Sequence, residues 1–256
     1  MMQPRDTISA AITAAVARGR PALVGFLTAG FPNRRQFKHN LTAVLGACDV
    51  VEIGVPFSDP MADGATIQRA SFVALADGVT LPWILQELRE IPAPRAAPVL
   101  LMSYLNPLLQ YGLEKLPGDA ARAGVAGFIV PDLPYEESGE LHTALDAEGI
   151  ALIQMVTPVT PPERLDMLCK SAQGFVYAVT MTGTTGKSAG VPDDVLAYMD
   201  RVKRCSTVPV CAGFGIRSRD QVASFGSHVD GVVVGSALVE ALERGDDVKA
   251  FLGSLR

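Results

Sequence analysis

The sequence predicts an α/β protein with the architecture of a (β/α)8 barrel. Three observations support this prediction. Eight short apolar runs recur along the 256 residues, helical patterns lie between them, and some of the runs share a weak internal repeat. The repeat reads VAGFIV at 125–130, AQGFVY at 172–177 and VDGVVV at 229–234, and each copy predicts a helix end, a glycine turn and a buried strand. Strands and helices that alternate along a whole chain are typical of an α/β fold.

The apolar runs predict eight strands. Their hydrophobicity is continuous rather than alternating, which indicates that both faces of each strand are covered, as in a parallel sheet wrapped by helices. The expected strands span residues 22–28, 50–54, 98–102, 127–130, 151–156, 174–178, 208–212 and 231–234.

Helices are predicted where apolar residues recur at helical spacing after a capping residue or a proline. The expected helices span residues 7–18, 34–45, 66–77, 137–148, 162–171, 192–205, 218–225 and 237–244. The charge-free segment 96–113 has the length of a marginal membrane span, but proline and polar residues interrupt it. We expect a buried strand followed by a loop there, and no membrane span.

The whole chain, residues 1–256, is expected to form one barrel domain, because no Pro-rich or Ser-rich linker divides it. A doubly wound open sheet is the alternative fold. Such sheets often carry the dinucleotide-binding pattern GxGxxG after the first strand, and this chain has TAGFP at 28–32 instead. The barrel is therefore the favoured architecture.

Composition excludes several classes of protein. The chain has 22 basic and 27 acidic side chains, 48% hydrophobic residues and 19% charged residues, which is far from the composition of disordered proteins. The scattered basic residues form no stripe that could neutralise a nucleic acid backbone. The first residues lack the pattern of an export signal, so we expect a cytoplasmic protein.

The residue types available for chemistry are also restricted. The three histidines (39, 142 and 228) and the four cysteines (48, 169, 205 and 211) show no metal-ligand spacing, so no metal site is expected and the cysteines are interpreted as buried thiols. No lysine falls inside an expected strand, where it could be desolvated for Schiff-base chemistry. Acid–base chemistry by carboxylates remains.

Glu52 is the first candidate, because it interrupts a strand that should be apolar on both faces. It shares a face with Val50 and Gly54, which directs its carboxylate toward the barrel mouth. A buried carboxylate is unfavourable unless it is paired or protonated, and a raised pKa suits general acid–base catalysis. The alternative is a structural glutamate bonded to a neighbouring hydroxyl or backbone N–H.

The loop 56–64 after this strand holds two more acids, Asp59 and Asp63. Either could form a turn or cap a helix, and the sequence alone supports that interpretation at least as well as a role for a second carboxylate across a substrate. Glycine turns follow the last three strands at 183–186, 213–215 and 235–236. Exposed N–H groups there, and a helix that begins at the last turn, predict a phosphate site.

The segment 51–68, which reads VEIGVPFSDPMADGATIQ, closely resembles the signature of the tryptophan synthase alpha subunit family. The resemblance extends in family order over FLTAG at 26–30, SYLNP at 103–107, PDLP at 131–134, FVY at 175–177, GFGI at 213–216 and VGS at 234–236. It implies a single-domain (β/α)8 barrel with extra helices at the N-terminus and in the second βα connection. It also implies a carbon–carbon lyase that cleaves indole-3-glycerol phosphate to indole and glyceraldehyde 3-phosphate.

The resemblance assigns roles residue by residue. Glu52 matches the glutamate that delivers a proton to indole C3 and helps to deprotonate the glycerol hydroxyl, Asp63 matches the aspartate that binds the indole N–H, and Tyr177 matches a tyrosine beside the glutamate. The apolar indole pocket of the family matches Phe26, Tyr104, Ile129 and Phe214. Its phosphate-binding positions match Gly186, Gly215, Gly235 and Ser236. Its mobile lid matches the loop in which Thr185 would hydrogen-bond Asp63. Core packing is the alternative for the apolar residues and for Tyr177.

The family works with a beta subunit that carries pyridoxal phosphate (PLP), so no cofactor is expected in this chain. The resemblance implies an alpha2beta2 heterotetramer in tryptophan biosynthesis, with partner-facing residues Pro56, Asp59, Asn106 and Pro107. Three alternatives stay open: a stand-alone lyase that releases free indole, a non-catalytic barrel that only activates a beta-type partner, and another phosphate-binding barrel enzyme of the same pathway.

Overall fold

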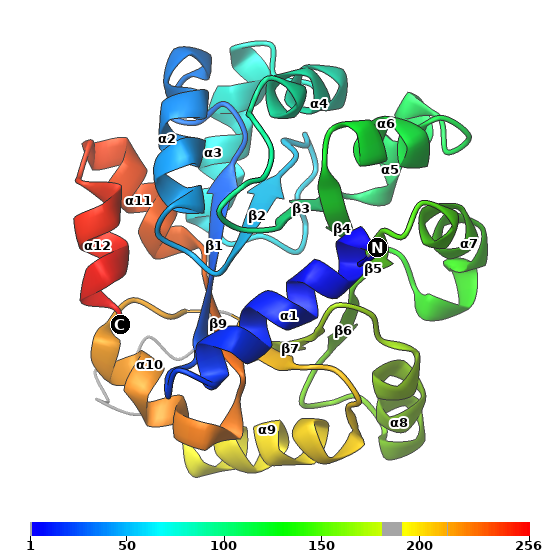
Figure 1. The fold of residues 1–256 in the computed structure, drawn as a ribbon, viewed down its shortest axis with the longest axis vertical. Helices are drawn as coiled ribbons and strands as arrows, with labels where there is room; N and C mark the ends of the chain where they lie inside the picture. The colour runs from blue at the N-terminus through cyan, green and yellow to red at the C-terminus, as the bar shows by residue number, and fades with distance from the viewer. Residues whose placement is uncertain (1, 181–190, 214) are drawn as a thin grey trace.

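The computed structural model describes residues 2–180, 191–213 and 215–256, and these form a barrel of parallel strands surrounded by helices (Figure 1). The strands are β1 (Ala22–Thr28), β2 (Val50–Gly54), β3 (Val99–Met102), β4 (Val125–Ile129), β5 (Ala151–Leu152), β6 (Gln154–Val156), β7 (Val176–Val179), β8 (Val210–Gly213) and β9 (Gly231–Val234). The continuous apolar runs are therefore strands, and nearly all of their residues are buried.

The sheet closes on itself at Ile153. The strand order is β5-β4-β3-β2-β1-β9-β8-β7-β6, with every pair parallel. Only Ile153 separates β5 from β6, and its N–H donates to the carbonyl of Phe128 at 2.9 Å. The two segments are thus halves of the single strand predicted at 151–156. The predicted eight-stranded barrel is confirmed, and the doubly wound alternative, which would leave two sheet edges, is wrong.

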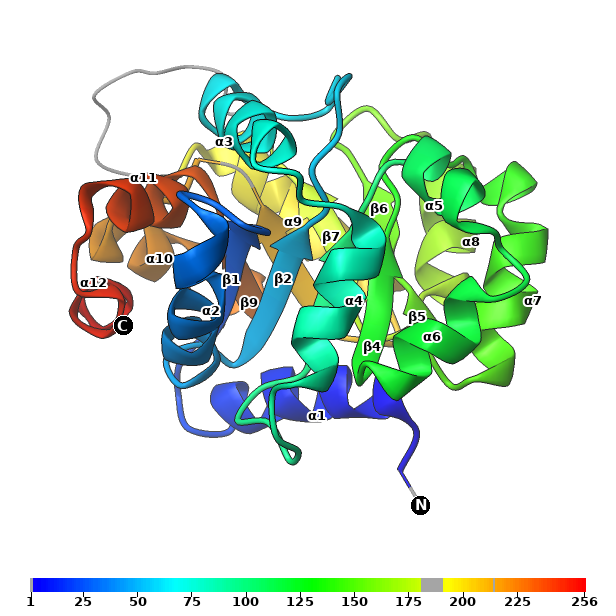
Figure 2. The same cartoon turned by 90° about the horizontal axis from the view of Figure 1, so that it is seen from above.

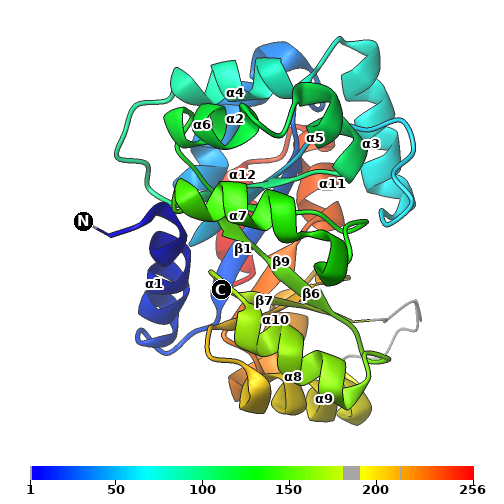
Figure 3. The same cartoon turned by 90° about the vertical axis from the view of Figure 1, so that its right-hand side faces the viewer.

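Helices surround this barrel on its outside (Figure 3). Within the described residues they are α1 (Pro4–Val16), α2 (Phe37–Leu45), α3 (Ala65–Ala76), α4 (Leu81–Arg89), α5 (Leu105–Tyr111), α6 (Leu116–Arg122), α7 (Gly139–Ala147), α8 (Pro162–Ser171), α9 (Asp193–Cys205), α10 (Arg219–Phe225), α11 (Ser236–Arg244) and α12 (Val248–Ser254), with short 3-10 turns at Arg34–Gln36, Tyr135–Glu137 and Gly226–His228. The extra helices implied by the resemblance are α1 before β1 and the pair α3 and α4 between β2 and β3.

Two details of the sequence interpretation were wrong. The segment expected to be a loop after β3 is helix α5. Pro107 is the third residue of this helix, where a backbone N–H has no acceptor inside the helix, so a proline without an N–H is tolerated. Two of the three repeat glycines lie inside strands rather than in turns. A Cβ at Gly127 would approach Leu100 Cδ2 to 2.8 Å, and one at Gly231 would approach Cys211 Sγ to 2.7 Å, so close packing requires glycine at both positions.

The hydrophobic interior of the barrel is closed at one end by α1. Ile8, Ile12 and Ala15 lie on one face of this helix, are fully buried and share a hydrophobic cluster with Val50 of β2 and with Phe175, which directly precedes β7. Figure 2 shows α1 crossing the end from which the strands start. A ligand site is therefore expected at the opposite, carboxyl end of the barrel, where β2 places Glu52.

Candidate active site

A cavity lies at the carboxyl ends of the strands. Many of the residues predicted for the site line it together, and these are Phe26, Glu52, Asp63, Ile129, Tyr177, Gly215, Gly235 and Ser236. They come from strands β1, β2, β4 and β7 and from loops that follow strands, so residues far apart in the sequence meet because parallel strands of a barrel all end at one face.

Glu52 is held in the wall of the cavity by the register of β2. It lies between Phe26 of β1 and Leu100 of β3, and only 1% of its surface is exposed. Its Oε2 atom has no hydrogen-bond partner within the described residues. Burial, with a smaller contribution from the charge of Asp63, raises the pKa of Glu52 to about 8. Glu52 therefore holds a proton at neutral pH and has an oxygen free to deliver it.

Asp63 approaches the same cavity from the loop between β2 and α3. Its carboxylate accepts a hydrogen bond from the Tyr104 hydroxyl at 3.1 Å, and that hydroxyl accepts one from the backbone N–H of Ala62 at 2.8 Å. Burial raises the pKa of Asp63 to about 6, and the bond from Tyr104 opposes this shift. Helix α3 is preceded by Gly64 and has no side-chain cap, so neither Asp59 nor Asp63 caps it.

Two glycines make room for the aromatic rings beside these carboxylates. A Cβ at Gly54 would lie 2.6 Å from Cζ of Phe26, and a Cβ at Gly213 would meet the ring and hydroxyl of Tyr177. Burial is the main cause that raises the pKa of Tyr177 well above its usual range, so its hydroxyl stays protonated. Glycine at these inward positions therefore lets Phe26 and Tyr177 lie flat against the barrel wall.

Residues suited to hold an anion lie along another side of the cavity. Gly215 has φ of +79° in the loop after β8, and Gly235 precedes the first residue of α11, Ser236. The first N–H groups of a helix have no partner inside it and carry the positive end of the helix dipole. This arrangement is suited to a phosphate group.

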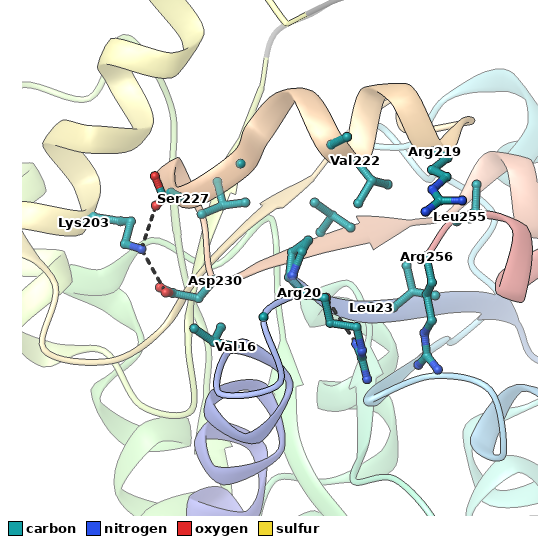
Figure 4. Close-up of a pocket in the computed structure, with 16 residues that line it drawn as sticks. Val16, Arg20, Leu23, Lys203, Arg219, Val222, Ser227, Asp230, Leu255 and Arg256 are labelled. Carbon is teal, nitrogen blue, oxygen red and sulfur yellow. Dashed lines mark hydrogen bonds and ion pairs between the residues drawn. The ribbon is translucent and has the colours of Figure 1, made fainter.

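A larger cavity, of about 500 Å³, lies at the amino end of the barrel (Figure 4). Arg20 in its wall is ion-paired with Asp49, and Lys203 is ion-paired with Asp230 at 2.9 Å. The amino end of a (β/α)8 barrel serves stability, and this cavity lacks the buried pair of protonatable carboxylates found at the other end. We therefore place the active site at the carboxyl end.

Residues 12–252 match the family model of the tryptophan synthase alpha chain. A curated tryptophan synthase alpha chain from Solidesulfovibrio magneticus is 46% identical over 253 residues, which cover 98% of this chain and 99% of that protein. One from Desulfovibrio desulfuricans is 48% identical over 244 residues, covering 94% and 96%. The chain belongs to the tryptophan synthase alpha chain family.

Solved structures of family members agree with the fold. The alpha subunit from Legionella pneumophila superposes with a TM-score of 0.88 at 31% identity, covering 100% of this chain and 97% of that one. A chain of Mycobacterium tuberculosis tryptophan synthase gives 0.88 at 36% identity, covering 97% and 96%. The predicted family, barrel and activity are confirmed: the family cleaves indole-3-glycerol phosphate to indole and glyceraldehyde 3-phosphate in tryptophan biosynthesis.

Some of the family's site positions are placed differently or not described. Thr185, Gly186 and Phe214 lie outside the described residues. Tyr104 is not among the residues that line the cavity, and instead its hydroxyl bonds Asp63 while its ring packs on Phe57 with centroids 5.2 Å apart. Its predicted contact with indole stays a prediction.

The four positions implied for partner contact lie in the loop after β2 and in the first turn of helix α5. Pro56, Asn106 and Pro107 line one hollow between the loop after β2 and helix α5. Asp59 is exposed on the same loop. Proximity alone does not test their role, so contact with a partner also stays a prediction.

Among the described residues, no group of three or more His, Cys, Asp or Glu side chains is placed to hold a metal ion. None of the described helices is long and apolar enough to span a bilayer. All four cysteines are free thiols, and Cys205 alone among them is only partly buried.

The sequence interpretation missed several residues of the cavity. Met102 and Met155 point into it from β3 and β6, two residues after Leu100 and Ile153 on the inward faces of their strands. That spacing could have identified them. Arg217 lies in the loop after β8, where no periodicity indicates which side chain faces the cavity.

Proposed function

We propose that in this chain Glu52 is the proton donor for the cleavage of indole-3-glycerol phosphate and that Asp63 accepts a hydrogen bond from the indole N–H. The observation that supports these roles is that two carboxyl groups, the buried Glu52 and the partly buried Asp63, line one cavity and have pKa values raised to about 8 and about 6. At neutral pH one is protonated and the other is ionised, as the two roles require.

The proton from Glu52 goes to C3 of the indole ring, which makes the ring an iminium-like electron acceptor. Asp63 stabilises the positive charge that develops on the ring nitrogen. The C3–C1′ bond of the substrate then breaks, its electron pair returns to the ring, and the C1′ hydroxyl loses its proton to the Glu52 carboxylate. Indole and glyceraldehyde 3-phosphate result, and Glu52 is protonated again.

Binding of the substrate is divided between apolar and polar parts of the site. Phe26, Ile129 and Tyr177 pack around the indole ring, and the backbone N–H groups of Gly215, Gly235 and Ser236 bind the phosphate. The phosphate is remote from the bond that breaks, so its binding energy serves to orient the indole against Glu52. The proposal includes Gly186 in the phosphate site, Phe214 in the pocket and Thr185 as a lid residue, as the resemblance of the motifs implies.

Assembly and location follow the family. The chain works in the cytoplasm as the alpha subunit of an alpha2beta2 tryptophan synthase, and the surface around Pro56, Asp59, Asn106 and Pro107 contacts the beta subunit. Proton transfer by carboxylates needs no cofactor in this chain, and PLP chemistry belongs to the beta subunit.

The test measures indole release from indole-3-glycerol phosphate by the purified chain, alone and with a beta subunit. Glu52→Gln is expected to lower kcat by about 10²–10⁴-fold while glycerol 3-phosphate still binds. Glu140→Gln, on the outer helix α7, is the control and keeps full activity. Full activity of Glu52→Gln would overturn the assignment of Glu52 as the proton donor. If the wild-type chain activated a beta subunit but cleaved no indole-3-glycerol phosphate, the non-catalytic alternative would be supported. Full cleavage without a beta subunit, unchanged by its addition, would support the stand-alone alternative.

A further inference from the structure

We propose that Arg217 is a positioning residue that binds the phosphate group of the substrate, an inference that rests on the proposed function. Of the described residues that line the active-site cavity, Arg217 is the one with a lysine or arginine side chain. The cavity also contains the carboxyl groups of Glu52 and Asp63. A phosphate dianion that enters beside these acids is stabilised by a cation in the same wall.

The guanidinium of Arg217 is anchored next to the predicted phosphate-binding backbone. Its Nη1 and Nη2 atoms donate to Oε2 and Oε1 of Glu240 at 2.7 and 2.9 Å. Glu240 lies on α11 one turn after Ser236, and the hydroxyl of Thr66 donates to its Oε1 at 3.1 Å. The backbone N–H of Arg217 donates to Gln221 Oε1 at 2.7 Å. Glu240 therefore fixes the guanidinium beside the first turn of α11, and Gln221 fixes the backbone of Arg217.

The ion pair with Glu240 leaves Arg217 able to bind a ligand. A guanidinium has five N–H donors, and two of them serve the carboxylate of Glu240, so three remain. About half of the side chain (52%) is exposed, so these donors are accessible. Glu240 thus orients the guanidinium in advance, which lowers the entropy lost when the phosphate binds.

A purely structural role for Arg217, bridging a loop to α11, is the competing explanation. The chain offers a matched control for it in Arg69 of α3, which forms the same two-pronged ion pair with Glu243, three residues after Glu240 on α11. The Arg69 side chain is exposed to a similar extent, at 49%, but does not line the cavity. Arg69→Gln therefore removes an equivalent bridge without removing a cation from the site.

The experiment measures binding of sn-glycerol 3-phosphate and of indole by calorimetry, together with the steady-state kinetics of cleavage. Arg217→Gln is expected to weaken glycerol 3-phosphate binding and to raise KM about ten-fold, with kcat changed less than about two-fold and indole binding unchanged. Arg217→Lys recovers part of the loss because it keeps the charge, and Arg69→Gln behaves as wild type.

Equal effects of Arg217→Gln and Arg69→Gln, or unchanged glycerol 3-phosphate binding in Arg217→Gln, would overturn the proposal. Calorimetry needs no turnover. If the wild-type chain failed to cleave indole-3-glycerol phosphate, the proposed function would be lost while the phosphate-binding role of Arg217 would still be decided by the binding data.

Discussion

At the scale of single residues, the two carboxyl groups of the cavity differ in their environment. Glu52 has an oxygen without a hydrogen-bond partner among the described residues and a pKa of about 8, whereas Asp63 is held by the Tyr104 hydroxyl and has a pKa of about 6. Glu52 is buried whereas Asp63 is only partly buried, and this difference together with the hydrogen bond from Tyr104 keeps Asp63 the more acidic of the two. This difference is the one that the proposed roles of proton donor for Glu52 and hydrogen-bond acceptor for Asp63 require.

These pKa values predict a bell-shaped dependence of kcat/KM on pH. Asp63 accepts a strong hydrogen bond only when ionised, so activity rises as the pH increases through about 6. Glu52 donates a proton only when protonated, so activity falls as the pH increases through about 8. The two limbs of the profile give the apparent pKa values of the Glu52 and Asp63 pair, and a series of initial rates at different pH values measures both. A profile that stays flat from pH 5 to 9 would contradict this assignment.

Replacement of Tyr104 tests whether its hydroxyl lowers the pKa of Asp63. Tyr104→Phe removes the hydrogen bond that lowers the pKa of Asp63, so the acid limb of the profile is expected to move to higher pH. Because Ala62 N–H also loses its partner, kcat/KM at pH 7 falls about ten-fold. Tyr111→Phe is the control, since Tyr111 donates to Asp119 at 2.7 Å on the outer helices. An unmoved acid limb in Tyr104→Phe would count against this role.

At the scale of elements, the alternation of a strand explains which side chains reach the cavity. Glu52 and Gly54 of β2 point inward together with Phe26 of β1, whereas Val51 and Ile53 pack against the outer helices. The inward glycines near strand ends then accept aromatic rings from neighbouring strands. Space inside the barrel, rather than a turn, is the reason for glycine at these positions.

Gly213→Ala is predicted to displace Tyr177, because the added Cβ would meet its ring and hydroxyl. We expect a loss of about 1–3 kcal/mol in the free energy of unfolding and at least a ten-fold loss in kcat/KM. Gly253→Ala on α12 is the control, since nothing lies within 4 Å of its added Cβ. Denaturant unfolding and initial rates measure both effects. Wild-type stability and activity of Gly213→Ala would show that the strands accommodate the methyl group.

At the scale of the whole molecule, the two ends of the barrel have different tasks. The amino end of the barrel interior is closed by apolar residues of α1, whereas the carboxyl end holds the buried Glu52 and the partly buried Asp63, whose desolvation disfavours the ionised folded state. Between about pH 4.5 and 8 the folded protein binds more protons at Glu52 than the unfolded chain does, so stability falls as the pH rises through this window.

This division predicts opposite effects of mutations at the two ends. Ile8→Ala removes a fully buried side chain from α1 and is expected to destabilise the fold by about 2–5 kcal/mol with kcat at 25 °C unchanged. Glu52→Gln is expected to lower kcat by about 10²–10⁴-fold but to be more stable than wild type at pH 8 by about 2–4 kcal/mol, with a smaller gain at pH 5. Denaturation curves at the two pH values measure both, and equal gains at pH 5 and 8 would contradict the raised pKa of Glu52.

The sequence by itself determined the strands, most of the helices, the barrel and the position of Glu52, because continuous apolar runs and their interruption by an acid are local features. It also carried the family, through a motif of contiguous residues at 51–68. Whether Asp63 caps a helix or faces the site was left open, and the bond from Tyr104, distant in the chain, is a tertiary contact.

Only the tertiary structure decided which loop residues meet. The placement of Tyr104 on Asp63 and the entry of Arg217 into the cavity depend on packing between segments far apart in the sequence. Loop side chains follow no periodicity, so their direction is set by neighbours that only the folded barrel brings together.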